Sequence, residues 1–163
     1  MAKNKEEKTN VMRVLEQKKI AYTPHSYPHE EGVAVDGVTV AQSMGFDPAI
    51  VFKTLVARGA SKQYYVFDVP VAENLDLKKA AKAVGEKSIE MIHQKELLPL
   101  TGYVHGGCSP VGMKKLFPTV IDASAENLET MIVSAGKIGY QVELAPRDLA
   151  ALVRAKFADL IAE

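Results

Sequence analysis

The chain has 163 residues, and its 20 lysine and arginine residues balance its 20 aspartate and glutamate residues, so its formal net charge is zero. Hydrophobic residues make up 47% of the chain, which excludes intrinsic disorder, and the neutral balance excludes a large, strongly basic nucleic-acid surface. A single cysteine, Cys108, excludes a disulfide-held fold, and the length predicts one domain over residues 1–163.

The distribution of apolar residues bears on the cellular location of the protein. Its longest stretch without Asp, Glu, Lys or Arg, residues 97–113, is interrupted by glycines and prolines, so we expect no membrane span and no membrane partner. The N-terminus is polar and lacks the apolar region of a secretory signal. Together with the lone cysteine, these features predict a cytoplasmic protein.

Helical and extended patterns alternate along the first half of the chain. Residues 6–20 have helical spacing, and their inward face is formed by Val11, Val14, Leu15 and Lys18. The segments that follow are an extended edge segment at 21–27 with Pro24, a helix at 39–44 that ends at Gly45, a turn at Asp47-Pro48 and a hairpin of strands at 50–58 and 63–69.

The second half continues the alternation. Its predicted elements are a helix at 77–84 capped by Asp76, a strand at 88–92, a helical turn at 93–98 stopped by Pro99, strands at 119–122, 130–134 and 140–144, and a final helix from Pro146 to about residue 155. This order predicts an α/β fold in which helices surround a mixed, partly closed, barrel-like β-sheet.

Lys53 is the first candidate site residue. Strand alternation places it on the same face as Val51 and Leu55. A lysine on an apolar strand face either keeps its ammonium group in water or directs it into a pocket. The residue alone favours the first interpretation, because buried lysines are rare.

The glycine-rich loop 102–112 is the second candidate. Its backbone amides could approach a ligand closely and hold an anion, and a set of tight turns is the alternative. Met113 stands where a nucleotide-binding loop requires lysine, which disfavours nucleotide hydrolysis. The segment 134–139, which ends a strand, offers a hydroxyl group and a lysine, or is a plain turn.

Cys108 and His105 form the one local pair that could supply a nucleophile or half a metal site. Three residues apart in an extended segment, their side chains point to opposite faces, and a buried, inert thiol is the more common outcome. No second cysteine exists, and the remaining histidines show no ligand spacing. We therefore expect neither a metal nor another cofactor.

Four motifs in order resemble the bacterial YbaK/EbsC family of trans-editing Cys-tRNA(Pro) deacylases. They are FKTL at 52–55, LDLKKAAK at 75–82, TGY with GGCSPVG within 101–112, and SAGK at 134–137. The resemblance covers nearly the whole chain. It implies an α/β, barrel-like fold similar to the editing insertion domain of prolyl-tRNA synthetases, and removal of mischarged cysteine from tRNA(Pro), with tRNA(Cys) as a further expected acceptor.

The resemblance also implies roles for residues. Lys53 matches the family's essential lysine, and the backbone amides of Gly106 and Gly107 are expected to stabilise an oxyanion. The expected substrate contacts are Tyr27, Thr54, Ser109, Ser134, Gly136 and Lys137. The expected partners are the aminoacylated CCA end of the tRNA and a prolyl-tRNA synthetase. The lysines that could contact the CCA tail are Lys53, Lys78, Lys79, Lys82, Lys114, Lys115 and Lys137.

The family chemistry implies that the thiol of the bound cysteine attacks its own carbonyl and leaves as a thiolactone, which fits a chain with no convincing nucleophile. The chain departs from relatives at Ala135, where many have glycine, at Gln141, where some have an acidic residue, and at Cys108, where isoleucine occurs. Two other interpretations stay open: a non-catalytic or regulatory module that binds tRNA or a synthetase, and an editing deacylase for another small amino acid such as alanine.

Overall fold

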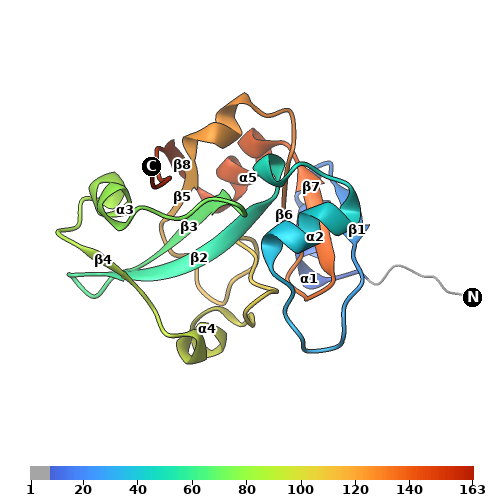
Figure 1. Ribbon diagram of the computed structural model, residues 1–163, viewed down its shortest axis with the longest axis horizontal. Helices are drawn as coiled ribbons and strands as arrows, with labels where there is room; N and C mark the ends of the chain where they lie inside the picture. The colour runs from blue at the N-terminus through green and yellow to red at the C-terminus, as the bar shows by residue number, and fades with distance from the viewer. Residues whose placement is uncertain (1–7) are drawn as a thin grey trace, which may run out of the picture.

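Two β-sheets form the framework of the protein, whose computed structural model describes residues 8–163. The strands are β1 (Thr23–Ser26), β2 (Phe52–Gly59), β3 (Tyr64–Pro70), β4 (Ile89–Met91), β5 (Thr119–Asp122), β6 (Met131–Ser134), β7 (Tyr140–Leu144) and β8 (Lys156–Ala158). One sheet has the order β4-β2-β3-β5-β8 and the other the order β1-β7-β6 (Figure 1). The larger sheet is mixed, because β5 runs parallel to β3 and β8 while β2 is antiparallel to its neighbours.

Five α-helices and two short 3-10 helices complete the described chain. They are α1 (Asn10–Gln17), α2 (Gly37–Met44), η2 (Pro48–Ile50), α3 (Leu77–Val84), α4 (Gln94–Thr101), η3 (Ala123–Asn127) and α5 (Pro146–Val153). The carboxylates of Asp36 and Asp76 each accept two backbone N–H groups at the first turns of α2 and α3. Gly45 and Gly85 end these helices in the left-handed conformation, which glycine adopts without a steric penalty.

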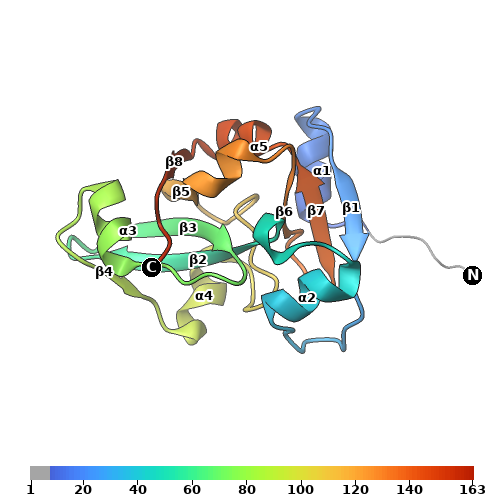
Figure 2. The same cartoon turned by 45° about the horizontal axis from the view of Figure 1, so that its top comes forward.

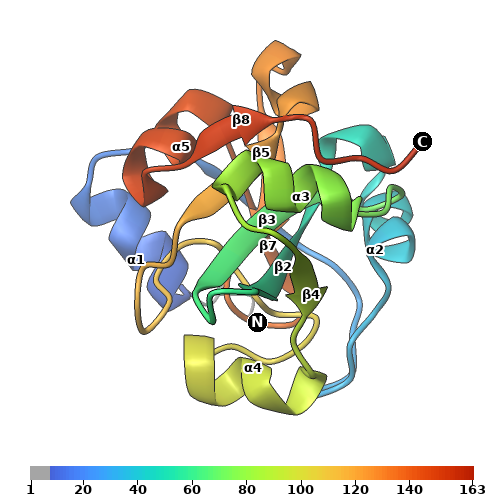
Figure 3. The ribbon, with the colours of Figure 1, turned by 90° about the vertical axis from the view of Figure 1, so that its left-hand side faces the viewer.

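Side-chain alternation along the larger sheet separates two parts of the core. Tyr65, Phe67 and Val69 of β3 pack with Ala80 and Ala81 of α3 on one face. The other face packs against α1, α4, α5 and the smaller sheet. As a result, α3 and α4 lie on opposite sides of the β2–β3 hairpin (Figures 1 and 3), whereas α1 lies beside β1 and β7 (Figure 2).

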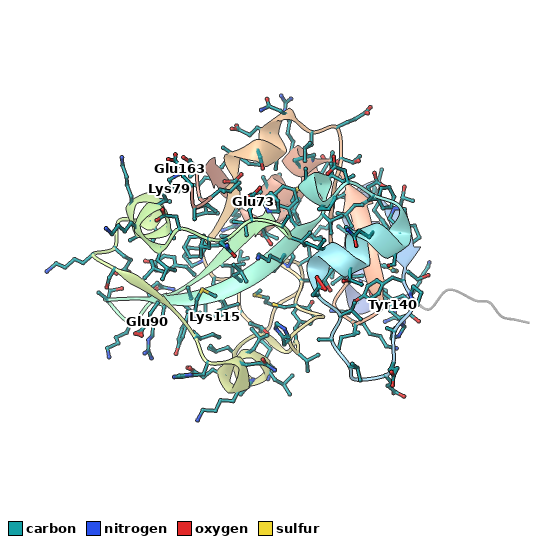
Figure 4. All side chains as sticks on the ribbon, in the orientation of Figure 1. Glu73, Lys79, Glu90, Lys115, Tyr140 and Glu163 are labelled. Carbon is teal, nitrogen blue, oxygen red and sulfur yellow. The ribbon has the colours of Figure 1, made fainter. Side chains whose placement is uncertain are left out.

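The C-terminal segment ties α3 to the edge of the larger sheet. Lys79 Nζ donates to the Asp159 carboxylate at 3.0 Å and to the carbonyl of Ile161 at 2.8 Å, and it lies 3.6 Å from the Glu163 carboxylate (Figure 4). Asp122 at the end of β5 accepts the backbone N–H of Leu160. No helix among residues 8–163 is long and apolar enough to cross a membrane.

The mixed α/β fold, the edge position of residues 21–27 and the hairpin are confirmed, but the barrel-like closure is not. The two sheets are joined by one parallel bridge between Val51 and Ile132, and among the described residues they do not close into a barrel. The bridge lies between η2, which ends at Ile50, and β2, which begins at Phe52, and it is an isolated pair that no ladder extends.

Local predictions are wrong at α1 and α4, and two short elements were missed. Lys18 is exposed, and Met12 is buried in its place on the inner face of α1, which ends at Gln17; residues 6 and 7 lie outside the described part of the chain. Pro99 does not stop α4, because Gly102 N donates to Leu98 O and Thr101 Oγ1 donates to the carbonyl of Leu97, so the last turn stays bonded. Neither η3 nor β8 was expected.

Candidate active site

A cavity of about 330 Å³ lies where the two sheets meet. Its wall comes from the end of β1, the start of α2, the start of β2, the loop around Gly106, and strands β6 and β7. Much of this wall is apolar, from Val35, Val40, Val51, Phe52, Leu55, Val71 and Leu97. The volume is at the lower end of the range for small-molecule sites, roughly 300–1,000 Å³.

Lys53 supplies a cation to this cavity. It is the second residue of β2, lines the cavity and is half-buried. Burial lowers the pKa of its ammonium group, and the negative charge of Glu73, on the segment after β3 (Figure 4), partly offsets this effect. In the described part of the chain Lys53 forms no hydrogen bond or salt bridge, so its charge is available to a ligand.

Three of the expected substrate contacts also line the cavity. They are Tyr27 just after β1, Thr54 on β2 and Ser134 at the end of β6. Burial raises the pKa of the Tyr27 phenol, so it is a neutral hydroxyl group at physiological pH. The Ser134 Oγ accepts the backbone N–H of Gly136 at 3.1 Å.

Gly106 and Gly107 occupy different environments. Gly106 lines the cavity with a φ of +90°, and a Cβ there would lie 2.7 Å from the Cβ of Ala34, so this position requires glycine. Gly107 does not line the cavity, and its backbone N–H donates to Val104 O at 2.9 Å. The oxyanion role predicted for Gly107 does not fit this geometry, because its amide is already used by the turn.

The structure places the remaining expected contacts outside the cavity wall. Ser109 is fully buried, and its Oγ accepts the backbone N–H of Val111. Gly136 packs under Tyr103 and Val11. Lys137 is exposed, with its ammonium 5.4 Å from the ring centre of Tyr140. The first two positions therefore shape the loop and turn that surround the site.

Few of the lysines considered for the CCA tail lie near the site. Lys79 is bonded to the C-terminal segment, as described above, and Lys114 Nζ donates to Pro99 O. Lys115 lies 5.9 Å from the ring centre of Phe117. Lys53 is the lysine that lines the cavity.

Two buried polar groups near the cavity were not given roles by the sequence. Gln141 lines the cavity, and its Oε1 has no hydrogen-bond partner in the described part of the protein. Asp68 is fully buried on β3 and accepts the hydroxyl of Thr54 on Oδ1 at 2.5 Å, while its Oδ2 has no partner among residues 8–163. The signal for Asp68 was present, since it is the one charged residue within the apolar strand 64–70.

Cys108 lines the same cavity but is poorly suited to act as a nucleophile. Burial, together with the negative charge of Asp68, raises the pKa of its thiol to about 12. A thiol that stays protonated at neutral pH is a weak nucleophile. Within residues 8–163, no group of three or more His, Cys, Asp or Glu side chains is placed to hold a metal ion.

Burial of Asp68 makes stability depend on pH. Desolvation raises the pKa of its carboxyl group from 3.8 to about 7, against the smaller opposite effect of the Thr54 hydroxyl. The protonated carboxyl group of Asp68 therefore contributes its full share to the free energy of unfolding below pH 3.8, and this contribution is lost as the pH rises through 7.

We expect the Asp68→Asn variant to gain free energy of unfolding relative to the wild type as the pH rises from 4 to 8. The difference should grow by about 4 kcal/mol, because one pKa unit corresponds to roughly 1.4 kcal/mol. Urea unfolding of both proteins at four pH values measures it, with the exposed Asp148→Asn as a control. Parallel curves for the wild type and Asp68→Asn would refute the burial effect.

Comparisons with known proteins place these observations in context. A family model described as an aminoacyl-tRNA editing domain matches residues 32–152. A protein of Enterococcus faecalis (strain ATCC 700802 / V583), named as a candidate Cys-tRNA(Pro)/Cys-tRNA(Cys) deacylase, EbsC, is 45% identical over 161 residues, which cover 98% of each chain.

Solved structures share the fold. A candidate trans-editing enzyme for prolyl-tRNA synthetase is 26% identical and superposes with a TM-score of 0.79, covering 94% of this chain and 95% of that one. A hypothetical protein, APE2540, is 20% identical with a TM-score of 0.82, covering 93% of this chain and 99% of that one, which is a likeness of fold.

Proposed function

This chain belongs to the aminoacyl-tRNA editing domain family, and we propose that it is a trans-editing deacylase that removes cysteine from tRNA(Pro) and from tRNA(Cys). The observation that carries the proposal is the half-buried ammonium of Lys53 in a small, largely apolar cavity, where it forms no hydrogen bond or salt bridge with residues 8–163. Such a cavity suits a small aminoacyl group, and a desolvated cation suits the negative charge that develops when an ester is attacked.

In this proposal the protein orients the ester and stabilises its charge. The carbonyl oxygen of the aminoacyl ester faces Lys53 and the backbone N–H of Gly106, which together form the oxyanion site. Tyr27 and Ser134 contact the aminoacyl group or the terminal ribose from the part of the wall that belongs to the smaller sheet. Positioning of this kind supplies a large part of the rate without a protein nucleophile.

The attacking group is the thiol of the bound cysteine. Its sulfur forms a bond to its own carbonyl carbon, the carbon–oxygen bond to the terminal ribose breaks, and the ribose oxygen takes up the proton that the thiol loses. The products are a cysteine thiolactone and free tRNA. The high pKa of Cys108 supports this assignment, because the protein's own thiol is a poor competitor for the role.

The neutral net charge supports the inference that a second protein helps to bind the tRNA in this reaction. A chain with no excess of lysine and arginine binds the phosphates of tRNA weakly by itself. We propose that it acts in the cytoplasm on the CCA end, in association with a prolyl-tRNA synthetase that raises the local concentration of substrate.

A deacylation panel tests the function. The protein is incubated with cysteinyl-, alanyl- and seryl-tRNA(Pro), and the remaining ester is measured over time. We expect the rate on cysteinyl-tRNA(Pro) to exceed the rate on alanyl-tRNA(Pro) by more than about 200-fold, the upper end for a pocket that discriminates by one small apolar group. Binding without deacylation would favour a regulatory module, and equal rates would favour an editing enzyme of broader range.

A further inference from the structure

The carboxylate of Asp68 lies directly behind the wall of the cavity. Asp68 and Thr54 are paired in register across the β2–β3 hairpin and face the same side of the sheet. Thr54 lines the cavity, whereas Asp68 is completely buried beneath it. The two side chains are joined by the hydrogen bond from Thr54 Oγ1 to Asp68 Oδ1 at 2.5 Å.

This hydrogen bond fixes the role that the Thr54 hydroxyl can play. A threonine hydroxyl has one proton and two lone pairs. Because Asp68 accepts that proton, the Thr54 oxygen can only accept a hydrogen bond from a group in the cavity. A ligand that meets Thr54 must therefore carry a donor at this point.

Among residues 8–163, no cation acts on the charge of Asp68. The groups that act on it are the Thr54 hydroxyl from β2 and the Cys108 thiol from the glycine-rich loop, and its β5 neighbour in register is the apolar Ile121. Its Oδ2 also lacks a hydrogen-bond partner in the part of the chain that the structure describes. A positively charged donor in the cavity would offset the cost of burying this carboxylate.

We propose that Asp68 is a positioning residue that makes Thr54 the acceptor for the α-ammonium group of the aminoacyl ester. This inference rests on the proposed deacylase function. Lys53 and Thr54 are consecutive on β2, so their side chains point to opposite faces of the strand, yet both line the cavity, because β4 pairs only with residues 57–59 and leaves the edge of β2 open beside it. The cation of Lys53 repels the ammonium and attracts the ester carbonyl, and the Thr54–Asp68 pair attracts the ammonium. The two residues thus set the orientation of the substrate.

A binding experiment tests this orientation without depending on turnover. The probes are 3′-deoxyadenosine carrying cysteine through a 3′-amide bond, which is not hydrolysed like an ester, and the same compound with an N-acetyl group in place of the ammonium. We expect the wild type at about pH 7.4, between the pKa of Asp68 and that of an α-amino group, to bind the probe with the free α-amino group about tenfold or more tightly than the acetylated form. No preference in the wild type would overturn the proposal.

Variants distinguish a positioning role of Asp68 from a purely structural one. Asp68→Asn and Thr54→Val should each remove the preference for the ammonium form, the double variant should lose nothing more, and Thr54→Ser should keep it. The control is Asp122→Asn. Asp122 is a buried acid on β5 that caps η3 and lies outside the cavity wall, so its replacement should change the affinities for both probes equally or not at all. An equal loss for both probes in Asp68→Asn would show a purely structural role.

Failure of the positioning role can be distinguished from failure of the deacylase function. If the wild type prefers the ammonium probe but leaves cysteinyl-tRNA intact, the function fails while the positioning role stands. If it deacylates cysteinyl-tRNA without any preference between the probes, the positioning role fails alone. Should Asp68→Asn not fold, the Thr54→Val and Thr54→Ser pair still decides the question.

Discussion

Replacing Lys53 with alanine should nearly abolish deacylation of cysteinyl-tRNA(Pro), with a loss of about 10²- to 10³-fold in kcat and little change in stability. One donor aimed at a developing oxyanion contributes roughly 3–4 kcal/mol of barrier reduction in a dry site. Lys53 is the lysine that lines the cavity, and it has no hydrogen-bond partner to lose among residues 8–163. Single-turnover deacylation together with thermal unfolding measures both quantities.

Controls for this variant come from the same chain. Lys87→Ala removes an exposed lysine outside the cavity wall and should keep normal activity. Lys53→Arg should also be poor, because the guanidinium group is larger and has a different shape. Near-normal turnover by a folded Lys53→Ala protein would reject Lys53 as the central residue of the site.

Cys108→Ala separates the two possible sources of a thiol. It should keep most of the activity, because the attacking thiol is proposed to belong to the substrate. A loss of about a thousandfold in a folded Cys108→Ala protein would instead identify Cys108 as a catalytic nucleophile.

Local chemistry explains which elements could be predicted from the sequence. Asp76 and Gly85 bracket α3 at both ends, and Tyr140–Leu144 is bounded by turn residues, so these elements follow from caps and turns that act within a few residues. By contrast, β8 is a three-residue edge strand that exists because β5 offers it a parallel partner. Such a strand has too few residues to show an alternating pattern.

The site was predicted in part for a similar reason. Lys53 and Thr54 both belong to one motif and both reach the cavity. Ser109 and Gly136 belong to motifs as well, yet they hold the surrounding loops in place, and a motif does not distinguish a packing residue from a contact. The role of Asp68 depends on its register with Thr54 across the hairpin, which only the folded chain specifies.

The identity of the attacking nucleophile determines which product is released first. A cysteinyl ester can cyclise through its thiol, an alanyl ester has no such group, and the hydroxyl of a seryl ester is a much weaker nucleophile at neutral pH. Cys108, the thiol that lines the cavity, is a poor replacement for the missing thiol, since its pKa is raised to about 12. The first product released from cysteinyl-tRNA should therefore be the thiolactone, and free cysteine should appear only as the ring opens.

The initial product of a single turnover on cysteinyl-tRNA(Pro) tests this account most directly. The reaction is stopped within one turnover in the presence of a maleimide, which labels free cysteine at once but labels the thiolactone only after hydrolysis. The account predicts released cysteine that is unreactive at first and becomes labelled after ring opening. Free cysteine as the sole initial product would contradict it, because water would then be the attacking group.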